Sequence, residues 1–193
     1  MPIEEMEPKP IRHPEYVYID YARQLSGRLR RTITGPMWHG PSLREALSGM
    51  NAADAVERPI RSMRTVWEIV LHVTARAERA EHAESARLRM DGLALEEPTP
   101  EEDWPPIPIP CTAAAWEHAQ VQMANAYRSM AVRVCEVMSS GFLKVVEKQS
   151  YNIATMSDGV AEHGAYHAAQ IVTLRKEIGS RRPHSATLTD SMW

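Results

Sequence analysis

Apolar side chains recur every three or four residues along four long stretches of the chain, with polar or charged residues between them. This spacing places the apolar side chains on one face of an α-helix. It predicts helices at about residues 14–32, 65–90, 112–138 and 156–178. Alternating β-branched runs, which are typical of strands, are missing from the sequence, so we expect an all-α fold.

Several of these stretches begin or end with residues typical of helix boundaries. Thr65 and Glu68 form a capping-box pattern at the start of the second stretch, and Thr155 and Asp158 form a similar one at the start of the fourth. Gly179 stands where the fourth helix is expected to end. A shorter helix is also expected between the first two stretches, around residues 42–47.

The connection between the second and third stretches, residues 93–111, contains six prolines. We expect no helix within it, because proline lacks the backbone N–H and clashes with the preceding turn. A connection of this length is unusual in a compact domain unless it crosses over the fold or builds a site. It would also allow the second and third helices to run parallel. We therefore predict a four-helix bundle with a long crossover connection between helices two and three.

The 193 residues correspond to one domain. We expect a single domain over residues 1–193, with its core at about 14–179 and a tail at 180–193. The two cysteines, Cys111 and Cys135, are expected to be free thiols in a reducing compartment.

Charge and hydropathy exclude two classes of partner. The formal net charge of −3 gives no basic surface for a phosphate backbone, so we expect no nucleic-acid partner. The chain has no apolar stretch of 18 residues and its first residues lack the apolar segment of a secretory signal. We therefore expect a cytoplasmic protein without a membrane partner.

The candidate chemistry centres on His163 and His167 in the fourth stretch. Two histidines four residues apart lie one turn apart on the same helix face, where both imidazoles can bind one metal ion. A solvated or hydrogen-bonded pair is the alternative, because a chain with eight histidines can contain such a spacing by chance. The pair borders the apolar seam, and buried polar groups need partners. A metal ion would satisfy both rings.

His72, in the middle of the second helix and among apolar residues, is the best candidate for a third ligand. The alternative is a hydrogen-bonded histidine in the core. Three histidines with one open position are typical of a catalytic zinc site, whereas structural zinc sites are usually closed by four protein ligands.

The segments around these histidines carry a family resemblance. Residues 67–74, Trp-Glu-Ile-Val-Leu-His-Val-Thr, and residues 159–171, Gly-Val-Ala-Glu-His-Gly-Ala-Tyr-His-Ala-Ala-Gln-Ile, resemble the helix-two and helix-four motifs of the DinB-like superfamily of metal-binding four-helix bundles. Residues 37–47 and 53–59 are similar to one branch of that family. The segments match in order and spacing over roughly residues 14–179.

The resemblance implies a divalent metal ion held by His72, His163 and His167. Zinc or nickel is expected first, with iron or manganese as the alternatives. Characterised relatives include thiol S-transferases that use bacillithiol or mycothiol and a mycothiol-dependent isomerase. Homodimers are frequent in the family. The resemblance therefore implies a small-molecule substrate, a low-molecular-weight thiol as a further partner, and a homodimer.

These observations predict a metal-dependent enzyme, either a thiol-dependent S-transferase or a related hydrolase, with no catalytic residue assigned. Gly164 follows His163 where the H-E-x-x-H motif of metalloproteases has glutamate, which argues against a protease. The alternative is a non-catalytic bundle that binds a metal or small ligand as a sensor or carrier, or a dimerisation scaffold.

Five further residues lie near the predicted ligands in the sequence or are candidates for the surroundings of the site. Gln170 either orients a ligand or is an ordinary polar residue beside the seam. Tyr166 is expected to pack against a neighbouring helix. Glu68 and Arg76 each lie one turn from His72 and either line a pocket or pair with each other across the turn of that histidine. His39 is expected in a surface turn, with a place over the site as the alternative.

Overall fold

The computed structural model describes residues 14–89, 97–136, 145–146 and 150–181. Within these ranges the chain is helical, with a single isolated bridge between Val145 and Asn152 and no strand. The prediction of an all-α fold is confirmed for this part of the chain.

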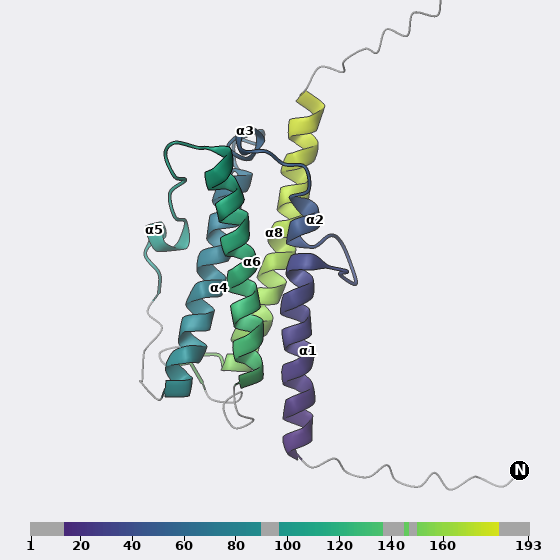
Figure 1. Cartoon of the computed structure of the whole chain (residues 1–193), viewed down its shortest axis with the longest axis vertical. Helices are drawn as coiled ribbons and strands as arrows, with labels where there is room; N and C mark the ends of the chain where they lie inside the picture. Colours follow the sequence, from purple (N-terminus) through teal and green to yellow (C-terminus); the bar gives the residue numbers. More distant parts are fainter. Residues whose placement is uncertain (1–13, 90–96, 137–144, 147–149, 182–193) are drawn as a thin grey trace, which may run out of the picture.

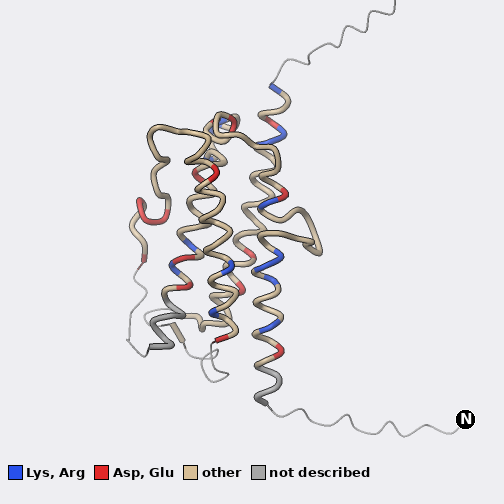
Figure 2. The backbone as a smooth tube through the Cα atoms, viewed as in Figure 1, with Lys and Arg blue, Asp and Glu red and all other residues tan. Residues whose placement is uncertain are grey.

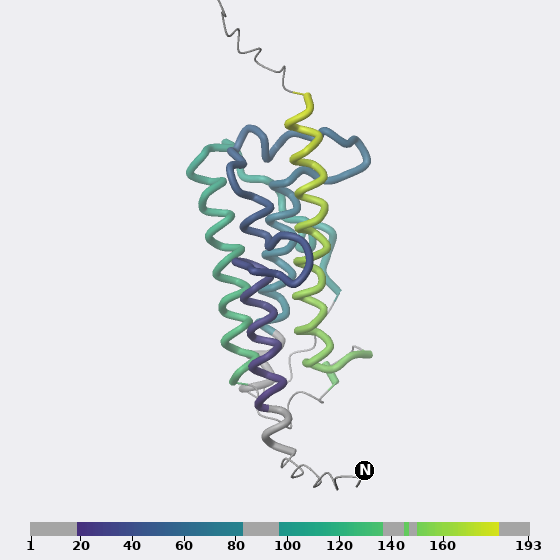
Figure 3. The backbone as a smooth tube through the Cα atoms, turned by 90° about the vertical axis from the view of Figure 1, so that its right-hand side faces the viewer, coloured from purple at the N-terminus to yellow at the C-terminus, as the bar shows by residue number. Residues whose placement is uncertain are grey.

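Four helices of more than 20 residues lie side by side (Figure 1). They are α1 (Pro14–Thr34), α4 (Val66–Arg89), α6 (Ala113–Glu136) and α8 (Ile153–Arg181). Helix α1 packs against α6 and α8, and α4 packs against the same two helices. Figure 3 shows α1 between α6 and α8. Helices α4 and α6 run in the same direction, as the length of their connection allows, and α1 and α8 run in the opposite direction.

The core lies between these four helices. The apolar positions behind the helix predictions are buried wherever their side chains are described, which removes them from water and supplies most of the driving force for folding. They are Ala22, Leu25, Leu29, Ile33, Val66, Val70, Val73, Ala77, Ala80, Trp116, Ala119, Met123, Tyr127, Met130, Val134, Val160, Gly164, Ala168, Ile171, Leu174 and Ile178. Two further positions of the pattern, Tyr18 and Val137, lie outside the described side chains.

The predicted capping box at the start of α4 is confirmed. The Thr65 hydroxyl accepts a hydrogen bond from the backbone N–H of Glu68 at 3.2 Å, and the Glu68 carboxylate accepts one from the backbone N–H of Thr65 at 2.7 Å. Two otherwise unpaired donors of the first turn are thereby satisfied.

The predicted capping box at the start of α8 is wrong. The helix begins at Ile153, and the side chain of Asn152 accepts a hydrogen bond from the backbone N–H of Thr155 at 2.9 Å. Asp158 therefore lies inside the helix. Its carboxylate accepts a hydrogen bond from Tyr21 at 2.7 Å and pairs with Arg28 at 2.8 Å.

The end of α8 also differs from the prediction. The helix continues through Gly179 to Arg181. The rest of the predicted tail, residues 182–193, lies outside the described residues. The division into a core and a tail within one domain stays a prediction.

Three short helices occupy the connections: α2 (Leu43–Ala46), α3 (Ala52–Ala55) and α5 (Pro100–Asp103). Helix α2 was expected from the sequence, whereas α3 was not. Helix α5 corrects the prediction that the proline-rich connection contains no helix. Pro100 occupies the first turn of α5, where a backbone N–H would have no partner within the helix. Thr99 and Glu102 form a capping box at the start of the same helix.

Charge divides the described part of this connection into two segments. Figure 2 shows α5 as an acidic turn, followed by the uncharged residues 104–112 that lead to α6. No helix in the described ranges is long and apolar enough to cross a lipid bilayer. Cys111 and Cys135 are exposed and free.

Candidate metal centre

Three histidines meet between α4 and α8. His72 lies on α4, and His163 and His167 lie one turn apart on α8. The Nε2 atom of His163 is 3.0 Å from the Nε2 atom of His72 and 3.0 Å from that of His167. One nitrogen from each ring lies within 4.8 Å of the other two. The structure thus brings the three predicted ligands together in a group that can hold a metal ion, and their role as ligands stays a prediction.

A close approach between helices fixes the position of α8 beside this cluster. Gly164 follows His163, and a Cβ atom at Gly164 would lie 2.5 Å from Thr32 Cγ2 and 2.6 Å from the Tyr127 hydroxyl oxygen. A larger side chain would therefore push α8 away from α1 and α6. This packing explains glycine at the position where a metalloprotease motif has glutamate.

The described connection between α4 and α6 holds the His72 ring. The Nδ1 atom of His72 donates a hydrogen bond to the backbone carbonyl oxygen of Asp103 at 2.6 Å. The Trp104 ring stacks on the imidazole, with centroids 3.8 Å apart and 2° between the planes. The Asp103 carboxylate in turn lies 2.5 Å from the Arg76 Nε atom. These contacts fix the orientation of the His72 ring.

His167 is held from its own helix. Its Nδ1 atom donates to the side-chain oxygen of Gln170 at 2.7 Å. The amide nitrogen of Gln170 donates to the hydroxyl oxygen of Tyr166 at 2.8 Å. Gln170 therefore has the orienting role that is one of its two interpretations from sequence.

The two carbonyl acceptors decide which nitrogens carry protons. A carbonyl oxygen accepts but cannot donate, so Nδ1 is protonated in His72 and in His167. In a neutral ring the Nε2 atom then presents a lone pair. His163 Nε2 faces both lone pairs at 3.0 Å and has at most one hydrogen to offer. A cation bound between the three nitrogens would satisfy all of them.

The spacing of these nitrogens also fits a metal ion. Two nitrogens bound at about 2.1 Å to a tetrahedral zinc ion lie about 3.4 Å apart. Two of the three nitrogen pairs are 3.0 Å apart, a few tenths of an ångström below this value, and the third pair lies within 4.8 Å. Movements of the rings on α4 and α8 would bring all three nitrogens onto one ion. The donor set and its spacing therefore suit a divalent ion.

Burial lowers the pKa of all three histidines, because a charged imidazolium loses hydration inside the protein. For His163, burial and the neighbouring rings of His167 and His72 lower the pKa to about 3. For His167, burial and the neighbouring His72 lower the pKa to about 4, although the hydrogen bond to Gln170 acts in the opposite direction. For His72, burial outweighs Asp103, which raises the pKa. All three rings are therefore neutral at pH 7 and able to act as ligands.

A cavity of about 430 Å³ lies against the three rings. Small-molecule sites have volumes of roughly 300–1,000 Å³. We call this space the histidine chamber; its described lining also includes Arg76, Asp103, Tyr166 and Gln170. Asp103 supplies the one carboxylate among the described lining residues, and that group is paired with Arg76. The chamber gives a ligand access to the cluster.

The structure decides the interpretations left open for the neighbouring residues. Arg76 lines the histidine chamber, while Glu68 caps α4 and pairs with Arg64 at 3.0 Å, so the two do not pair with each other. Tyr166 does not pack against a neighbouring helix. Its side chain is 61% exposed because this part of α8 borders the chamber instead. His39 is exposed, as expected for a surface turn.

Sequence reasoning did not identify Asp103 and Trp104. Asp103 is the last residue of the short helix α5 and Trp104 follows it, in the connection where no helix was expected. The available signal was the capping-box pattern of Thr99 and Glu102, which ends one residue before Asp103. The length of the connection pointed only to a crossover or an unspecified site.

Comparison of the chain with protein-family models, curated proteins and solved structures finds no significant match.

Proposed function

We propose that this protein is a divalent-metal-dependent enzyme in which His72, His163 and His167 hold the ion and one position stays open. The observation that carries the proposal is the convergence of the three Nε2 atoms, with His72 and His167 held by carbonyl oxygens on their opposite nitrogens. The histidine chamber supports a catalytic site over a closed structural one, because it leaves room for an exchangeable ligand. Zinc or nickel is the expected ion, with iron or manganese as the alternatives.

We also propose that the chain has the DinB-like four-helix-bundle fold, formed by α1, α4, α6 and α8. Two observations support this assignment. The candidate ligands come from the second and fourth long helices, as the resemblance implies, and α4 and α6 run parallel on either side of a long connection. The same resemblance extends the proposal to a cytoplasmic homodimer.

The chemistry of the chamber favours thiol transfer over peptide hydrolysis. A bound divalent ion acts as a Lewis acid that favours the deprotonated form of water or a thiol at neutral pH. Asp103 is committed to Arg76, so the described lining offers no free carboxylate as a general base. A thiol that is already deprotonated needs no such base. In the transfer, sulfur bonds to an electrophilic carbon, the leaving group departs with the bonding electron pair, and the thiol proton passes to solvent. Simple hydrolysis is the related alternative.

Metal analysis tests the first part of the proposal. We expect about one equivalent of a divalent ion in untagged wild-type protein and loss of that ion in His163→Ala. The variant His118→Ala removes an exposed histidine on α6 and should retain the metal. If neither wild type nor His118→Ala holds a metal after incubation with zinc, nickel, iron or manganese, the metal-centre proposal is wrong.

Thiol dependence tests the reaction. Metal-loaded protein should accelerate the loss of 1-chloro-2,4-dinitrobenzene, or of another electrophile in a screen, only when a low-molecular-weight thiol is present. Equal rates with and without thiol would replace the transferase with a hydrolase. A metal-loaded protein without turnover in either assay would favour the non-catalytic binding bundle.

A further inference from the structure

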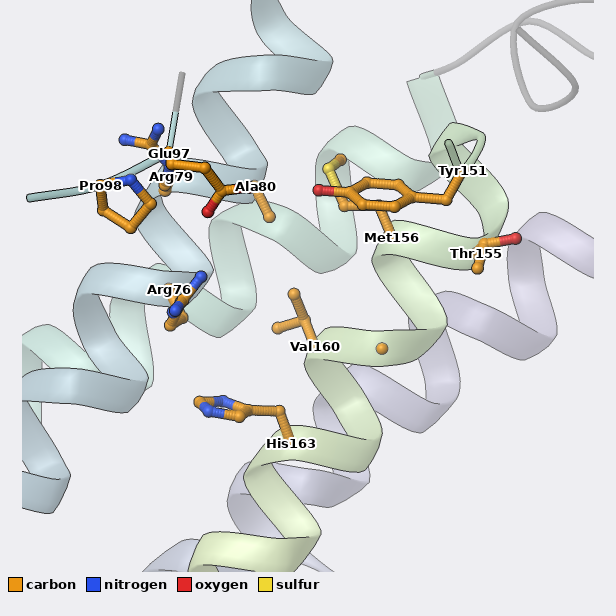
Figure 4. A pocket seen from close by; sticks show the side chains of 11 residues that line it. Arg76, Arg79, Ala80, Glu97, Pro98, Tyr151, Thr155, Met156, Val160 and His163 are labelled. Atoms are coloured by element: carbon orange, nitrogen blue, oxygen red, sulfur yellow. The ribbon is translucent and has the colours of Figure 1, made fainter. Parts of the chain in front are cut away.

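A second cavity, of about 380 Å³, lies between α4 and α8 next to the histidine chamber (Figure 4). Arg76 and His163 line both cavities. The side chains of these two residues therefore form a wall shared by the two cavities, and the His163 ring faces the second cavity directly. A molecule in the second cavity lies beside the site where chemistry is proposed.

The inner wall of the second cavity is apolar. Ala80 on α4 and Val160 on α8 are buried, and Met156 is half-buried beside them. Figure 4 shows these side chains between the two helices. Such a surface favours the hydrocarbon part of a ligand, because its burial removes apolar area from water.

The lining of the same cavity includes an arginine, Arg79, that pairs with no described residue. Arg79 is half-buried and makes no ion pair or hydrogen bond with any described residue, whereas the neighbouring Arg76 is paired with Asp103. Glu97 is the one acidic side chain among the described lining residues, and it is exposed and forms no ion pair within the described chain. A partly desolvated guanidinium next to an apolar wall favours a ligand that brings its own negative charge.

We propose that the second cavity binds a small organic anion, with a carboxylate or similar acid group on Arg79 and an apolar body along Ala80, Met156 and Val160. We further propose that this anion is the substrate of the adjoining metal centre. The substrate role rests on the proposed function, whereas the anion site does not. The negative charge of Glu97 in the same lining opposes binding of the acid group.

Binding of three linear eight-carbon probes tests the site. Calorimetric titration of metal-free wild-type protein should show binding of octanoate. It should show at least tenfold weaker binding of 1-octanol, because a charge-assisted hydrogen bond is lost. Octylammonium should bind no better than 1-octanol. Equal affinities for octanoate and 1-octanol, or no binding of octanoate at millimolar concentration, would overturn the proposal.

Charge variants locate the acid group. Arg79→Gln should weaken octanoate binding about tenfold, whereas Arg23→Gln, which removes an exposed arginine on α1, should leave it unchanged. Glu97→Gln should strengthen binding several-fold, a gain that misfolding cannot produce. Equal octanoate affinity in wild type, Arg79→Gln and Glu97→Gln would show that the acid group does not bind at Arg79.

One variant separates this proposal from the metal centre. His72 does not line the second cavity, so His72→Ala should lose the metal and still bind octanoate with unchanged affinity. Octanoate binding without any metal binding in wild type would leave the anion site standing and remove the metal-centre function. Metal binding without octanoate binding would do the reverse.

Discussion

The indole ring of Trp104 lies parallel to the imidazole of His72, with the ring centroids 3.8 Å apart and an angle of 2° between the planes. This contact joins the connection after α5 to the candidate metal centre. The guanidinium carbon of Arg64 lies 4.8 Å from the Trp104 ring centroid. His72 therefore depends on a side chain from outside the four long helices for its orientation.

Replacement of Trp104 should weaken metal binding without unfolding the core. Trp104→Ala removes the stacked ring, so His72 gains rotational freedom, and we expect the affinity for zinc to fall about tenfold. Trp104→Phe keeps an aromatic face and should lose less. Competition with a chromogenic chelator measures both affinities. Equal zinc affinity in wild type and Trp104→Ala would mean that the Asp103 carbonyl alone orients the ring.

Replacement of Gln170 should act through His167. Gln170→Leu removes the acceptor of the His167 Nδ1 hydrogen, and we expect zinc affinity to fall by about 10-fold to 100-fold. Gln170→Glu keeps an oxygen acceptor and should retain zinc affinity near that of wild type. A smaller loss in Gln170→Leu than in Gln170→Glu would contradict the assigned tautomer of His167.

Two glycines on α8 should respond in opposite ways to alanine. Gly164→Ala places a methyl group against Thr32 and Tyr127, and we expect the free energy of unfolding to fall by about 1–3 kcal/mol. Gly159 lies on the same helix, and a Cβ atom there would meet no neighbouring atom within 4 Å. Gly159→Ala should therefore raise the free energy of unfolding by roughly 0.5–1 kcal/mol. Urea unfolding monitored by circular dichroism measures both changes. Similar shifts in the two variants would show that α8 does not approach α1 and α6 closely at Gly164.

Acid should destabilise the metal-free protein. Burial holds the pKa of His163 at about 3 and that of His167 at about 4, whereas histidine in the unfolded chain has a pKa of about 6.5. Below pH 6.5 the unfolded state therefore binds protons that the folded state does not. The free energy of unfolding should then decrease as the pH falls from about 6.5 to about 4.

The urea midpoint at pH 7.5, 6 and 5 measures this trend in protein freed of metal with a chelator. His163→Leu supplies the control, because it removes one of the three rings whose protonation burial opposes. Its midpoint should vary less with pH than that of wild type. An equal pH dependence in both proteins would assign the loss of stability to other groups.

The long helices and the histidine cluster were predictable because each depends on a local period. A three-to-four spacing defines the buried faces, and the four-residue spacing of His163 and His167 places both rings on one face of α8. His72 could be predicted as the third ligand because it is a polar residue among the apolar residues of the buried face of α4. The arrangement of Asp103, Trp104 and Tyr166 was not predictable in this way. It depends on the path of an irregular connection and on which part of α8 borders a cavity.

Helix boundaries were predictable only where one capping residue had no competitor. Thr65 caps α4 as expected. At α8 the side chain of Asn152 caps first, so Thr155 and Asp158 fall inside the helix. Asp158 instead forms an ion pair with Arg28 on α1, and a pattern of neighbouring residues in the sequence carries no information about such a contact.

Helix α5 and Trp104, the residue after it, lie outside the four long helices and pack against α4. The core thus sets the positions of the three histidines, while a separate stretch of the chain sets the orientation of one of them. Substitutions or length changes in this stretch can alter metal affinity and access while the core sequence stays constant. Changes confined to this stretch should therefore affect the candidate metal centre more than the stability of the core.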